Sequence, residues 1–492
     1  MIEYILLSIY GLCVLTLFIY GVNCYYMVWR FWKTRRRAVA QLRQQSEAIQ
    51  TISPDNAQLP HVTTQIPLYN EANVAERVIR AVADIDYPSA KHEIQILDDS
   101  TDQTCAIVDA VAAALRLSGK DIQVFRRDSR QGFKAGALAA GLVACKGEFV
   151  AIFDSDFVPD KNFLLQMIPV LLADGKLAFV QARWGHLNAG HSILTQTQSI
   201  GIDGHFMIEQ SARAYNGFFM NFNGTAGVWR KSAIEGAGGW QADTLTEDMD
   251  LSYRCQLAGW HATFLPDVVV PAELPETYTA FKSQQFRWAK GSIQTALKLF
   301  PRVLRSSANK MAKLQAFLHL THYSIHPIMV VLSLLTLPVL LMLSVSLPWQ
   351  IMAVLMACII VAICGPSSLY MTSQMVASNG FKKLFYLPAL MCVGVGIALS
   401  NTRAVIEALL NIKSGFVRTP KHGDATSRRY LVYQVGAPVL PIFEILLGLY
   451  CMVSLLYYLE AKHYMIGPFL LIYACGFLLV GIRSFIEGLA QS

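Results

Sequence analysis

Long apolar segments lie on both sides of a more polar stretch that runs from about residue 61 to 275. Residues Tyr4 to Trp29 are apolar over enough length to cross a bilayer as one helix. Further apolar segments follow the polar stretch, at 323–345, 349–371, 384–400, 435–459 and 464–486. The chain is 54% hydrophobic and 15% charged, whereas soluble domains are about 25% charged. The sequence therefore predicts a multi-pass membrane protein with a polar domain after its first span.

A basic cluster follows the first apolar segment and sets its orientation. The cluster contains Arg30, Lys33, Arg35, Arg36, Arg37 and Arg43. Basic residues beside a span stay on the cytoplasmic side. We therefore expect 1–30 to be a transmembrane helix with its N-terminus outside, 31–60 a basic cytoplasmic linker, and the polar domain cytoplasmic, in a plasma or inner membrane. A cleavable signal peptide is the alternative, but the chain starts Met-Ile-Glu, without a basic residue.

The apolar segment at 384–400 differs from the others because both of its flanks are basic. Lysines precede it at 382 and 383, and the basic residues after it are Arg403, Lys413, Arg418, Lys421, Arg428 and Arg429. Both flanks should then be cytoplasmic, which predicts an interfacial or re-entrant element within 384–425. Five crossings remain, made by the first span and by hairpins at 323–371 and 434–487; six crossings are the alternative. Residues 276–322 interleave aromatic and basic side chains, a pattern typical of helices at the membrane interface.

Cysteine spacing and net charge argue against two other kinds of site. The ten Cys residues have no metal-like spacing, so we expect free thiols and no zinc site. Most of them lie in apolar segments, where cysteine packs as a small apolar residue. The net charge of +7 is modest, and we expect no nucleic-acid partner.

Strand and helix patterns alternate along the polar stretch. Strands are predicted at 61–66, 93–97 and 122–126, and amphipathic helices at 74–85 and 105–117. This order argues for a doubly wound, Rossmann-like α/β domain over 61–275, with right-handed crossovers. Ligands bind such sheets beyond the carboxyl ends of the strands, so the loops at those ends should form the site.

One apolar run in this domain ends in two carboxylates. Phe149–Phe153 has the length and residue types of a buried strand, and Asp154 and Asp156 follow it. Two carboxylates held together repel each other unless a cation lies between them. A hard cation, Mg²⁺ or Mn²⁺, would suit these oxygens and could neutralise a diphosphate. The alternative is a solvated Asp-x-Asp turn without a ligand.

Two further clusters in the first half of the domain carry groups that suit a nucleotide. Asp98 and Asp99 follow a predicted strand and could accept hydrogen bonds from a nucleobase or a ribose hydroxyl. The alternative is that this segment only caps the next helix. Lys134 stands at a glycine-rich helix start, where a cation and exposed N–H groups suit a diphosphate.

Two clusters in the second half carry groups that suit acid–base chemistry and sugar binding. Glu247 and Asp248 precede an amphipathic helix, where an acid is either a cap or a general base for an attacking hydroxyl. Gln284, Arg287 and Trp288 combine an amide, a guanidinium that can bind a diphosphate, and an indole that can stack on a sugar. The alternative for the last cluster is ordinary membrane-interface chemistry.

These clusters occur in an order that resembles a known family. The stretches that carry the resemblance are QIPLYNE, IQILDDSTD, FKAGAL, VQARWG, FNGTAGVWR, GGW, TEDMDLSYR and QQFRW. Over about 61–425 the chain resembles the processive family-2 glycosyltransferases of the cellulose synthase superfamily. It is most similar to the cellulose-synthase-like mannan and glucomannan synthases of plants.

The resemblance implies a GT-A catalytic domain that uses a nucleotide-diphosphate sugar with Mg²⁺ or Mn²⁺. Asp98 and Asp99 would contact the nucleoside, Lys134 the diphosphate or base, and Asp154 and Asp156 the metal and phosphates. Asp248 would be the base, with Glu247 beside it. The remaining implied residues are Asn223, Gly224 and Thr225 at the acceptor site, Gln284, Arg287 and Trp288 at the acceptor end and pyrophosphate, and Phe416, Thr419 and Lys421 of a gating loop. That loop lacks the family's Val before Thr419.

The function expected from this resemblance is polymerisation of hexose, from UDP-glucose or GDP-mannose, into a β-linked polysaccharide that the protein also translocates. Transfer of a single sugar to a lipid such as ceramide or diacylglycerol is the alternative. A non-catalytic membrane scaffold is a third possibility, and it gives no reason for the ordered acidic clusters. The sequence leaves the donor, the linkage and any accessory subunit open.

Overall fold

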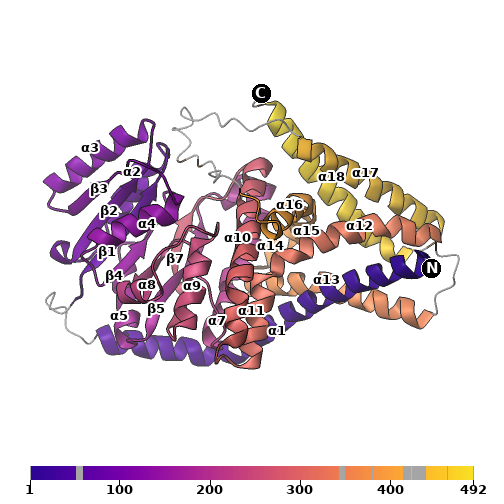
Figure 1. Cartoon of the computed structure of the whole chain (residues 1–492), viewed down its shortest axis with the longest axis horizontal. Coiled ribbons are helices and arrows are strands. Elements are labelled where there is room, and N and C mark those ends of the chain that lie inside the picture. The colour runs from indigo at the N-terminus through magenta and orange to yellow at the C-terminus, as the bar shows by residue number, and fades with distance from the viewer. Residues whose placement is uncertain are drawn as a thin grey trace.

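The computed structural model describes residues 2–50, 59–342, 349–377, 380–413, 421, 423, 439–462 and 464–490. An α/β domain lies at one end of the molecule, and a group of long helices extends from its other side (Figure 1). The N-terminal helix α1 (Ile2–Gln50) runs along one edge of the molecule from the helical group to the α/β domain. It therefore belongs to both parts.

A mixed sheet of seven strands forms the centre of the α/β domain, in the order β3-β2-β1-β4-β6-β5-β7. The strands are β1 (Val62–Leu68), β2 (His92–Asp98), β3 (Asp121–Phe125), β4 (Phe149–Ile152), β5 (Leu177–His186), β6 (Gly227–Arg230) and β7 (His261–Ala272). The first four in chain order are parallel, β6 is antiparallel to both β4 and β5, and β7 is parallel to β5. The Rossmann-like sheet expected from the sequence is confirmed.

Helices cover both faces of this sheet, which is why its central strand β4 is apolar throughout. In β4, Phe149 and Ala151 pack into one core, whereas Val150 and Ile152 pack into a second core on the other face. The helices of the domain are α2 (Ala75–Ala83), α3 (Thr104–Leu117), α4 (Phe133–Ala144), α5 (Phe163–Ala173), α6 (Ile193–Asp203), the π-helical turn η3 (Gly204–Gln210), α7 (Ser211–Tyr215), α8 (Lys231–Gly236) and α9 (Glu247–Leu257). Because neighbouring residues of a strand face opposite sides, a strand buried on both faces is a continuous apolar run.

Two helices connect the α/β domain to the helical part of the molecule. They are α10 (Tyr278–Arg305) and α11 (Lys310–Leu320). In Figure 1 α10 stands upright between the sheet and the long helices. Its amphipathic pattern therefore reflects a position between two bodies of the protein, with one side toward the α/β domain and the other toward the long helices.

Five helices of the described residues are long and apolar enough to cross a membrane. They are α1, α12 (Ile325–Met342), α13 (Trp349–Val376), α17 (Val439–Glu460) and α18 (Gly467–Leu489). The pair α15 (Leu387–Gly396) and α16 (Ala398–Leu409) passes the same test only as one span bent by 41°. A Cβ added at Gly396 would collide with the carbonyl oxygen of Gly476 in α18, so glycine permits this bend to pack closely. These helices suit a membrane protein with five crossings, or six if the bent pair spans.

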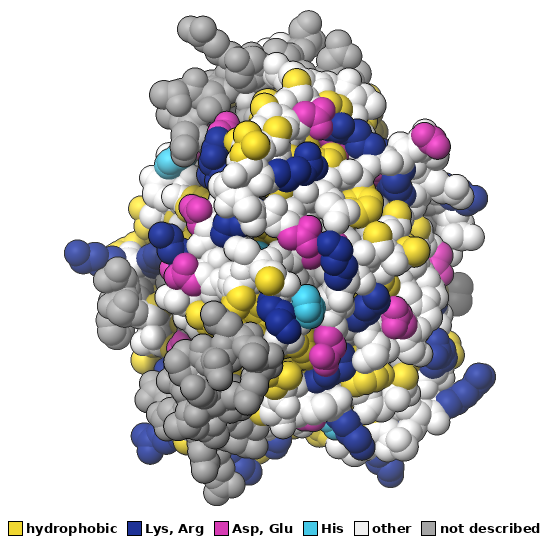
Figure 2. Space-filling view, turned by 90° about the vertical axis from the view of Figure 1, so that its left-hand side faces the viewer, with side chains coloured by type: hydrophobic (Ala, Val, Ile, Leu, Met, Phe, Trp, Pro, Cys, Tyr) yellow, Lys and Arg dark blue, Asp and Glu magenta, His cyan; other side chains and the backbone are white. Residues whose placement is uncertain are grey.

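The outer surfaces of the two parts differ as this assignment requires. On the end of the α/β domain that faces away from the long helices, basic and acidic side chains are interspersed (Figure 2). The long helices instead expose apolar side chains, such as Leu446, Leu449, Val453 and Leu456 of α17. A charged surface suits water, and an exposed apolar helix face suits lipid.

Helix α1 extends further than the sequence led us to expect. We predicted a linker over residues 31–60, but α1 continues through the basic cluster to Gln50. Residues 31–50 contain no Gly or Pro and are rich in Ala, Arg and Gln, which favour a helix. Beyond the apolar segment this helix contacts the α/β domain, where Thr34 Oγ1 accepts a hydrogen bond from Asn216 Nδ2 at 3.3 Å.

Candidate active site

A cavity of about 210 Å³ lies beyond the carboxyl ends of β1, β2, β4, β5 and β7, and α10 closes its far side. Most residues singled out from the sequence line it: Asp99, Lys134, Asp154, Asp156, Asn223, Gly224, Glu247, Asp248, Gln284, Arg287, Trp288 and Lys421. Asp98 and Thr225 are not part of its lining, and Phe416 and Thr419 lie outside the described residues. The structure thus brings together side chains that are up to 322 positions apart in the chain, from Asp99 to Lys421.

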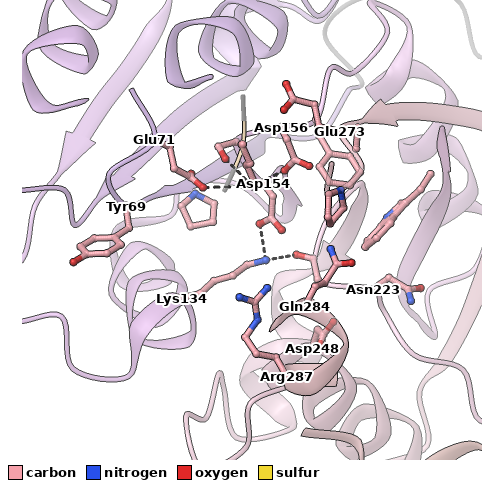
Figure 3. A pocket seen from close by; sticks show the side chains of 18 of the residues that line it. Tyr69, Glu71, Lys134, Asp154, Asp156, Asn223, Asp248, Glu273, Gln284 and Arg287 are labelled. Atoms are coloured by element: carbon pink, nitrogen blue, oxygen red, sulfur yellow. Dashed lines mark hydrogen bonds and ion pairs between the residues drawn. The ribbon is translucent and has the colours of Figure 1, made fainter. Parts of the chain in front are cut away.

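The two carboxylates after β4 each hold a lysine. Lys134 Nζ lies 2.6 Å from Asp154 Oδ1 and also donates to the carbonyl oxygen of Gly224 at 2.8 Å (Figure 3). Lys421 Nζ lies 2.5 Å from Asp156 Oδ1 and 3.4 Å from Glu71 Oε1. Each of the two carboxylates after β4 is therefore paired with one ammonium group.

Burial and neighbouring charges shift the pKa values of these groups in opposite directions. Burial raises the pKa of the Asp156 carboxyl, although the ammonium of Lys421 opposes this effect. Burial lowers the pKa of Lys134, but Asp154, Glu247 and Asp248 together raise that pKa above its usual value. Lys134 is therefore a fixed positive charge on the floor of the cavity, as a site for a diphosphate requires.

The donor set at the end of β4 suits a hard divalent cation. Mg²⁺ and Mn²⁺ prefer oxygen ligands, and such ions are often held by one or two carboxylates together with substrate phosphates. Asp154 and Asp156 supply that number of carboxylates, with side chains 30% and 10% exposed. Among the residues that the structure describes, no group of three or more His, Cys, Asp or Glu could hold a metal. A cation here would need further oxygen ligands from the bound substrate.

Asp98 and Asp99 have different positions although they are neighbours. Asp98 is fully buried, accepting from Arg126 Nε at 2.9 Å and from the Ser100 amide at 3.0 Å. Asp99 lines the cavity and accepts from Arg127 Nε at 3.0 Å. Of the two carboxylates expected to contact a nucleoside, only Asp99 lies where it can do so.

Glu247 and Asp248 lie in the first turn of α9 and line the cavity together with the carboxylates after β4. Burial raises the pKa of Asp248, and the neighbouring carboxylate of Glu247 raises it further. Gly224 faces this pair with φ of +80°, and a Cβ there would lie 3.3 Å from both Asp248 Oδ2 and Lys134 Nζ. A carboxyl group with a raised pKa that opens into a cavity can act as a general base near neutral pH.

The three residues expected from α10 enter the cavity from one face of that helix. Gln284 and Arg287 point toward Lys134 and Asp154 in Figure 3. Burial lowers the pKa of Arg287 to about 10, although Asp154 and Glu247 oppose this effect. The Trp288 ring lies 6.4 Å from that of Trp184, which also lines the cavity. Together they give the cavity an aromatic wall next to its charged floor.

Asn223 is fixed by side chains of the π-helical turn. Its amide lies 3.0 Å from His205 Nε2 and 2.5 Å from Gln210 Nε2, and both partners belong to η3. Its backbone N–H donates to Gln181 Oε1 at 2.9 Å. The wider turn of a π-helix, which is frequent at functional sites, aims both partners at one residue. A rigid amide at the cavity wall suits a sugar hydroxyl.

The cavity also includes residues that the sequence reasoning did not single out. They are Tyr69, Glu71, Arg130, His186 and Glu273. The guanidinium of Arg130 lies 3.3 Å from the centre of the Tyr69 ring, which forms a flat surface near Asp99. All of these residues except Arg130 end a strand or follow one. The expectation that ligands bind beyond the carboxyl ends of the strands could therefore have identified most of them.

Comparison with known proteins places the chain in a family. Residues 60–291 match the family described as "Glycosyltransferase like family 2". The chain is 32% identical over 444 residues to "Probable glucomannan 4-beta-mannosyltransferase 10" of Arabidopsis thaliana, which covers 86% of this chain and 77% of that protein. The chain belongs to glycosyltransferase family 2.

Further relatives of this family 2 glycosyltransferase match a shorter region. "Probable glucomannan 4-beta-mannosyltransferase 7" of Oryza sativa subsp. japonica is 44% identical over 249 residues, 50% of this chain and 43% of that protein. The match thus spans less than half the length of the rice relative. Among solved structures, "Mannosyltransferase PcManGT from Pyrobaculum calidifontis in complex with GDP-Man and Mn2+" is 19% identical, with a TM-score of 0.49, over 81% of this chain and 100% of that one.

The family assignment confirms three expectations. The chain is an enzyme, a glycosyltransferase; its α/β domain is the GT-A fold of family 2; and its relatives are the mannan-type synthases that the motifs indicated.

Proposed function

We propose that this family 2 glycosyltransferase adds hexose units one at a time to a β-linked polysaccharide of the mannan type. The observation that carries the proposal is the composition of the cavity, where the carboxylates after β4, the carboxylates of α9 and the Gln284–Trp288 face of α10 meet. The names of the relatives support mannose as the transferred sugar. GDP-mannose is then the first donor to test, and UDP-glucose is the second.

The donor would lie across the floor of the cavity. Its nucleoside fits the flat surface made by Tyr69 and Arg130, within reach of the Asp99 carboxylate. Its diphosphate fits beside the fixed charge of Lys134. A Mg²⁺ or Mn²⁺ ion held by Asp154 and Asp156 would neutralise charge that develops on the leaving diphosphate. Because Lys421 now pairs with Asp156, that pair must loosen when the cation binds.

Asp248 is the proposed general base. Its carboxylate would take the proton of the acceptor hydroxyl as that oxygen attacks the anomeric carbon and the bond to the diphosphate breaks. One such displacement inverts the configuration at the anomeric carbon and needs no covalent nucleophile. The raised pKa of Asp248 suits this role, because a base with a pKa nearer neutrality holds the proton more firmly than an ordinary aspartate.

The acceptor would enter from the side of α10. Trp288 and Trp184 offer ring surfaces for a sugar, and Gln284 and Asn223 offer amides for its hydroxyls. The product would leave between the membrane helices beyond α10, and the basic cluster at the end of the first span supports a cytoplasmic position for the catalytic domain. The N-terminus would then lie outside.

The experiment is a donor screen with the purified full-length protein, Mg²⁺ or Mn²⁺, and enzymatic digestion of the product. We expect a polymer that grows with time and that a β-mannanase degrades. Asp248→Asn should abolish growth while leaving donor binding intact, and Asp121→Asn, which changes an exposed carboxylate paired with Lys146, is the matched control. A product carrying a single sugar on a lipid would establish the alternative of lipid glycosylation. No transfer from either donor would refute the proposal.

A further inference from the structure

Three helices that follow the catalytic domain each direct one carboxylate at α10. Glu407 lies in α16, Glu444 in α17 and Glu487 in α18. Glu444 is fully buried within a span of high hydropathy. An ionisable residue at such a place is costly and usually serves a function, with a specific partner. In each of the three cases that partner belongs to α10.

The pair between Glu444 and Lys282 is deeply buried. Lys282 Nζ lies 2.7 Å from a carboxylate oxygen of Glu444, and the two side chains are 9% and 0% exposed. Ser484 of α18 lies on the same ammonium at 3.5 Å. Removing either charge would leave the other buried without its partner, which is far more costly than replacing both by apolar groups. The pair therefore fixes α10 against α17.

The pair between Glu407 and Lys290 fixes α10 at a second point. Lys290 Nζ lies 2.8 Å from Glu407 Oε2 and donates to the carbonyl oxygen of Ile412 at 2.7 Å. The other oxygen of Glu407 accepts from Arg403 Nε at 2.8 Å. Lys290 is fully buried. This contact joins α10 to the bent pair α15–α16.

Glu487 holds the beginning of α10. Its carboxylate accepts from the backbone N–H groups of Tyr278 and Thr279 at 2.9 and 2.8 Å, and from Thr279 Oγ1 at 2.8 Å. These N–H groups have no partner within the helix, and an anion at this end also suits the helix dipole. The last turn of α18 thereby sets where α10 starts.

The contacts with the membrane helices and the cavity lie on opposite sides of α10. At about 100° per residue, Lys282 and Lys290 are separated by about 80° around the helix axis. Arg287, Gln284 and Trp288 lie at about 140°, 200° and 240° from Lys282 on the same scale. The lysines face Glu444 and Glu407, while the other three residues line the cavity. A shift of the lysines thus moves the residues of the cavity wall.

We propose that Glu407, Glu444 and Glu487 are positioning residues for the acceptor. Acting through α10, they hold Gln284, Arg287 and Trp288 at the place where the acceptor sugar binds, so that the membrane helices set the affinity of the catalytic site for its acceptor. This inference rests on the proposed function, because it needs a sugar acceptor at that wall. It assigns no contact with substrate to the three glutamates themselves.

The experiment compares Lys282→Met, Glu444→Gln and the double variant Lys282→Met/Glu444→Leu in the full-length protein. The measurements are transfer from GDP-mannose to a β-linked manno-oligosaccharide, binding of that oligosaccharide, and binding of GDP by calorimetry. Each single variant should lower kcat/KM for the oligosaccharide about 10- to 100-fold, since displacements of about 1 Å cost that much, while the Kd for GDP changes less than about twofold. The double variant should have a higher kcat/KM for the oligosaccharide than either single variant, because it leaves no buried charge unpaired.

Lys298→Met is the matched control on the same helix. Lys298 also forms ion pairs, at 2.7 Å to Asp243 and 2.8 Å to Asp250, but both partners belong to the α/β domain. The variant Lys298→Met should leave oligosaccharide binding unchanged. Single variants with the parent's kcat/KM, or with GDP and oligosaccharide binding reduced in parallel, would overturn the inference. If the parent protein transfers no sugar, the proposed function fails, and the positioning role is decided by oligosaccharide binding alone.

Discussion

Replacing Lys421 by methionine should strengthen the binding of a divalent cation in the absence of a donor. The ammonium of Lys421 lies 2.5 Å from Asp156 and 3.4 Å from Glu71. It therefore occupies the negative field that a cation at Asp156 would use. Methionine keeps most of the length of the side chain and removes only the charge that competes for the carboxylate.

The size of the effect follows from the burial of this pair. The side chains of Lys421 and Asp156 are 17% and 10% exposed, so the pair lies between a surface ion pair and a fully buried one. Surface pairs contribute up to about 1 kcal/mol, and breaking buried pairs costs about 3–5 kcal/mol. A value of about 2 kcal/mol for displacing the ammonium corresponds to about a 30-fold lower Kd for the cation.

The assay is a titration of the purified protein with Mn²⁺, followed by calorimetry or by the loss of the free-ion spin resonance signal. Lys146→Met is the control, since Lys146 pairs with Asp121 at 2.7 Å away from the cavity, and it should leave the Kd for Mn²⁺ unchanged. Lys421→Met/Asp156→Asn should lose the gain. An unchanged or weaker affinity for Mn²⁺ in Lys421→Met would refute the reasoning, because the ammonium would then not compete for the site.

Other substitutions and conditions test the remaining roles. Asp248→Asn should lower kcat by about 10²- to 10⁴-fold with the Kd for the nucleoside diphosphate unchanged, measured by initial rates and calorimetry. Because burial and Glu247 raise the pKa of Asp248, its ionised fraction, and with it kcat, should rise with pH over a range above that of an ordinary aspartate; a flat pH–rate profile would contradict this. Asp98→Asn should destabilise the fold by about 1–3 kcal/mol, seen as a lower unfolding temperature, but leave nucleotide binding intact, whereas Asp99→Asn should weaken nucleotide binding. Trp288→Ala should raise KM for the acceptor and not for the donor, and equal changes in both would argue against stacking.

The alternation of strands and helices predicted the centre of the fold well. The apolar run Phe149–Phe153 was identified because a continuous apolar run of this length is typical of a strand buried on both faces, and its end located Asp154 and Asp156. Strands β5, β6 and β7 were not predicted. The antiparallel strand β6 (Gly227–Arg230) includes Gly and Arg beside its apolar residues, so it lacks the continuous apolar run that revealed β4. Helix α1 was cut short because the prediction followed the end of hydrophobicity and not helix propensity.

The candidate site could be predicted only where its residues depend on local sequence. Asp98 and Asp99 seemed equivalent, yet Asp98 is the last residue of β2 and is buried against Arg126, whereas Asp99 follows the strand and lines the cavity. The contact of Lys421 with Asp156 joins positions that are 265 residues apart, and no local pattern reports such a pair. The same holds for Lys282 and Glu444, whose partners were fixed only by the packing of α10.

The unbroken course of α1 has a mechanical consequence. A helix of 49 residues is roughly 74 Å long, and this one begins in a segment apolar enough to cross a membrane and ends beside the α/β domain. A flexible connection would let the α/β domain move independently of the bilayer. A continuous helix instead converts any tilt of its apolar half into a displacement of the sheet. The thickness of the surrounding bilayer thereby becomes a variable that can change how the two halves of the molecule meet.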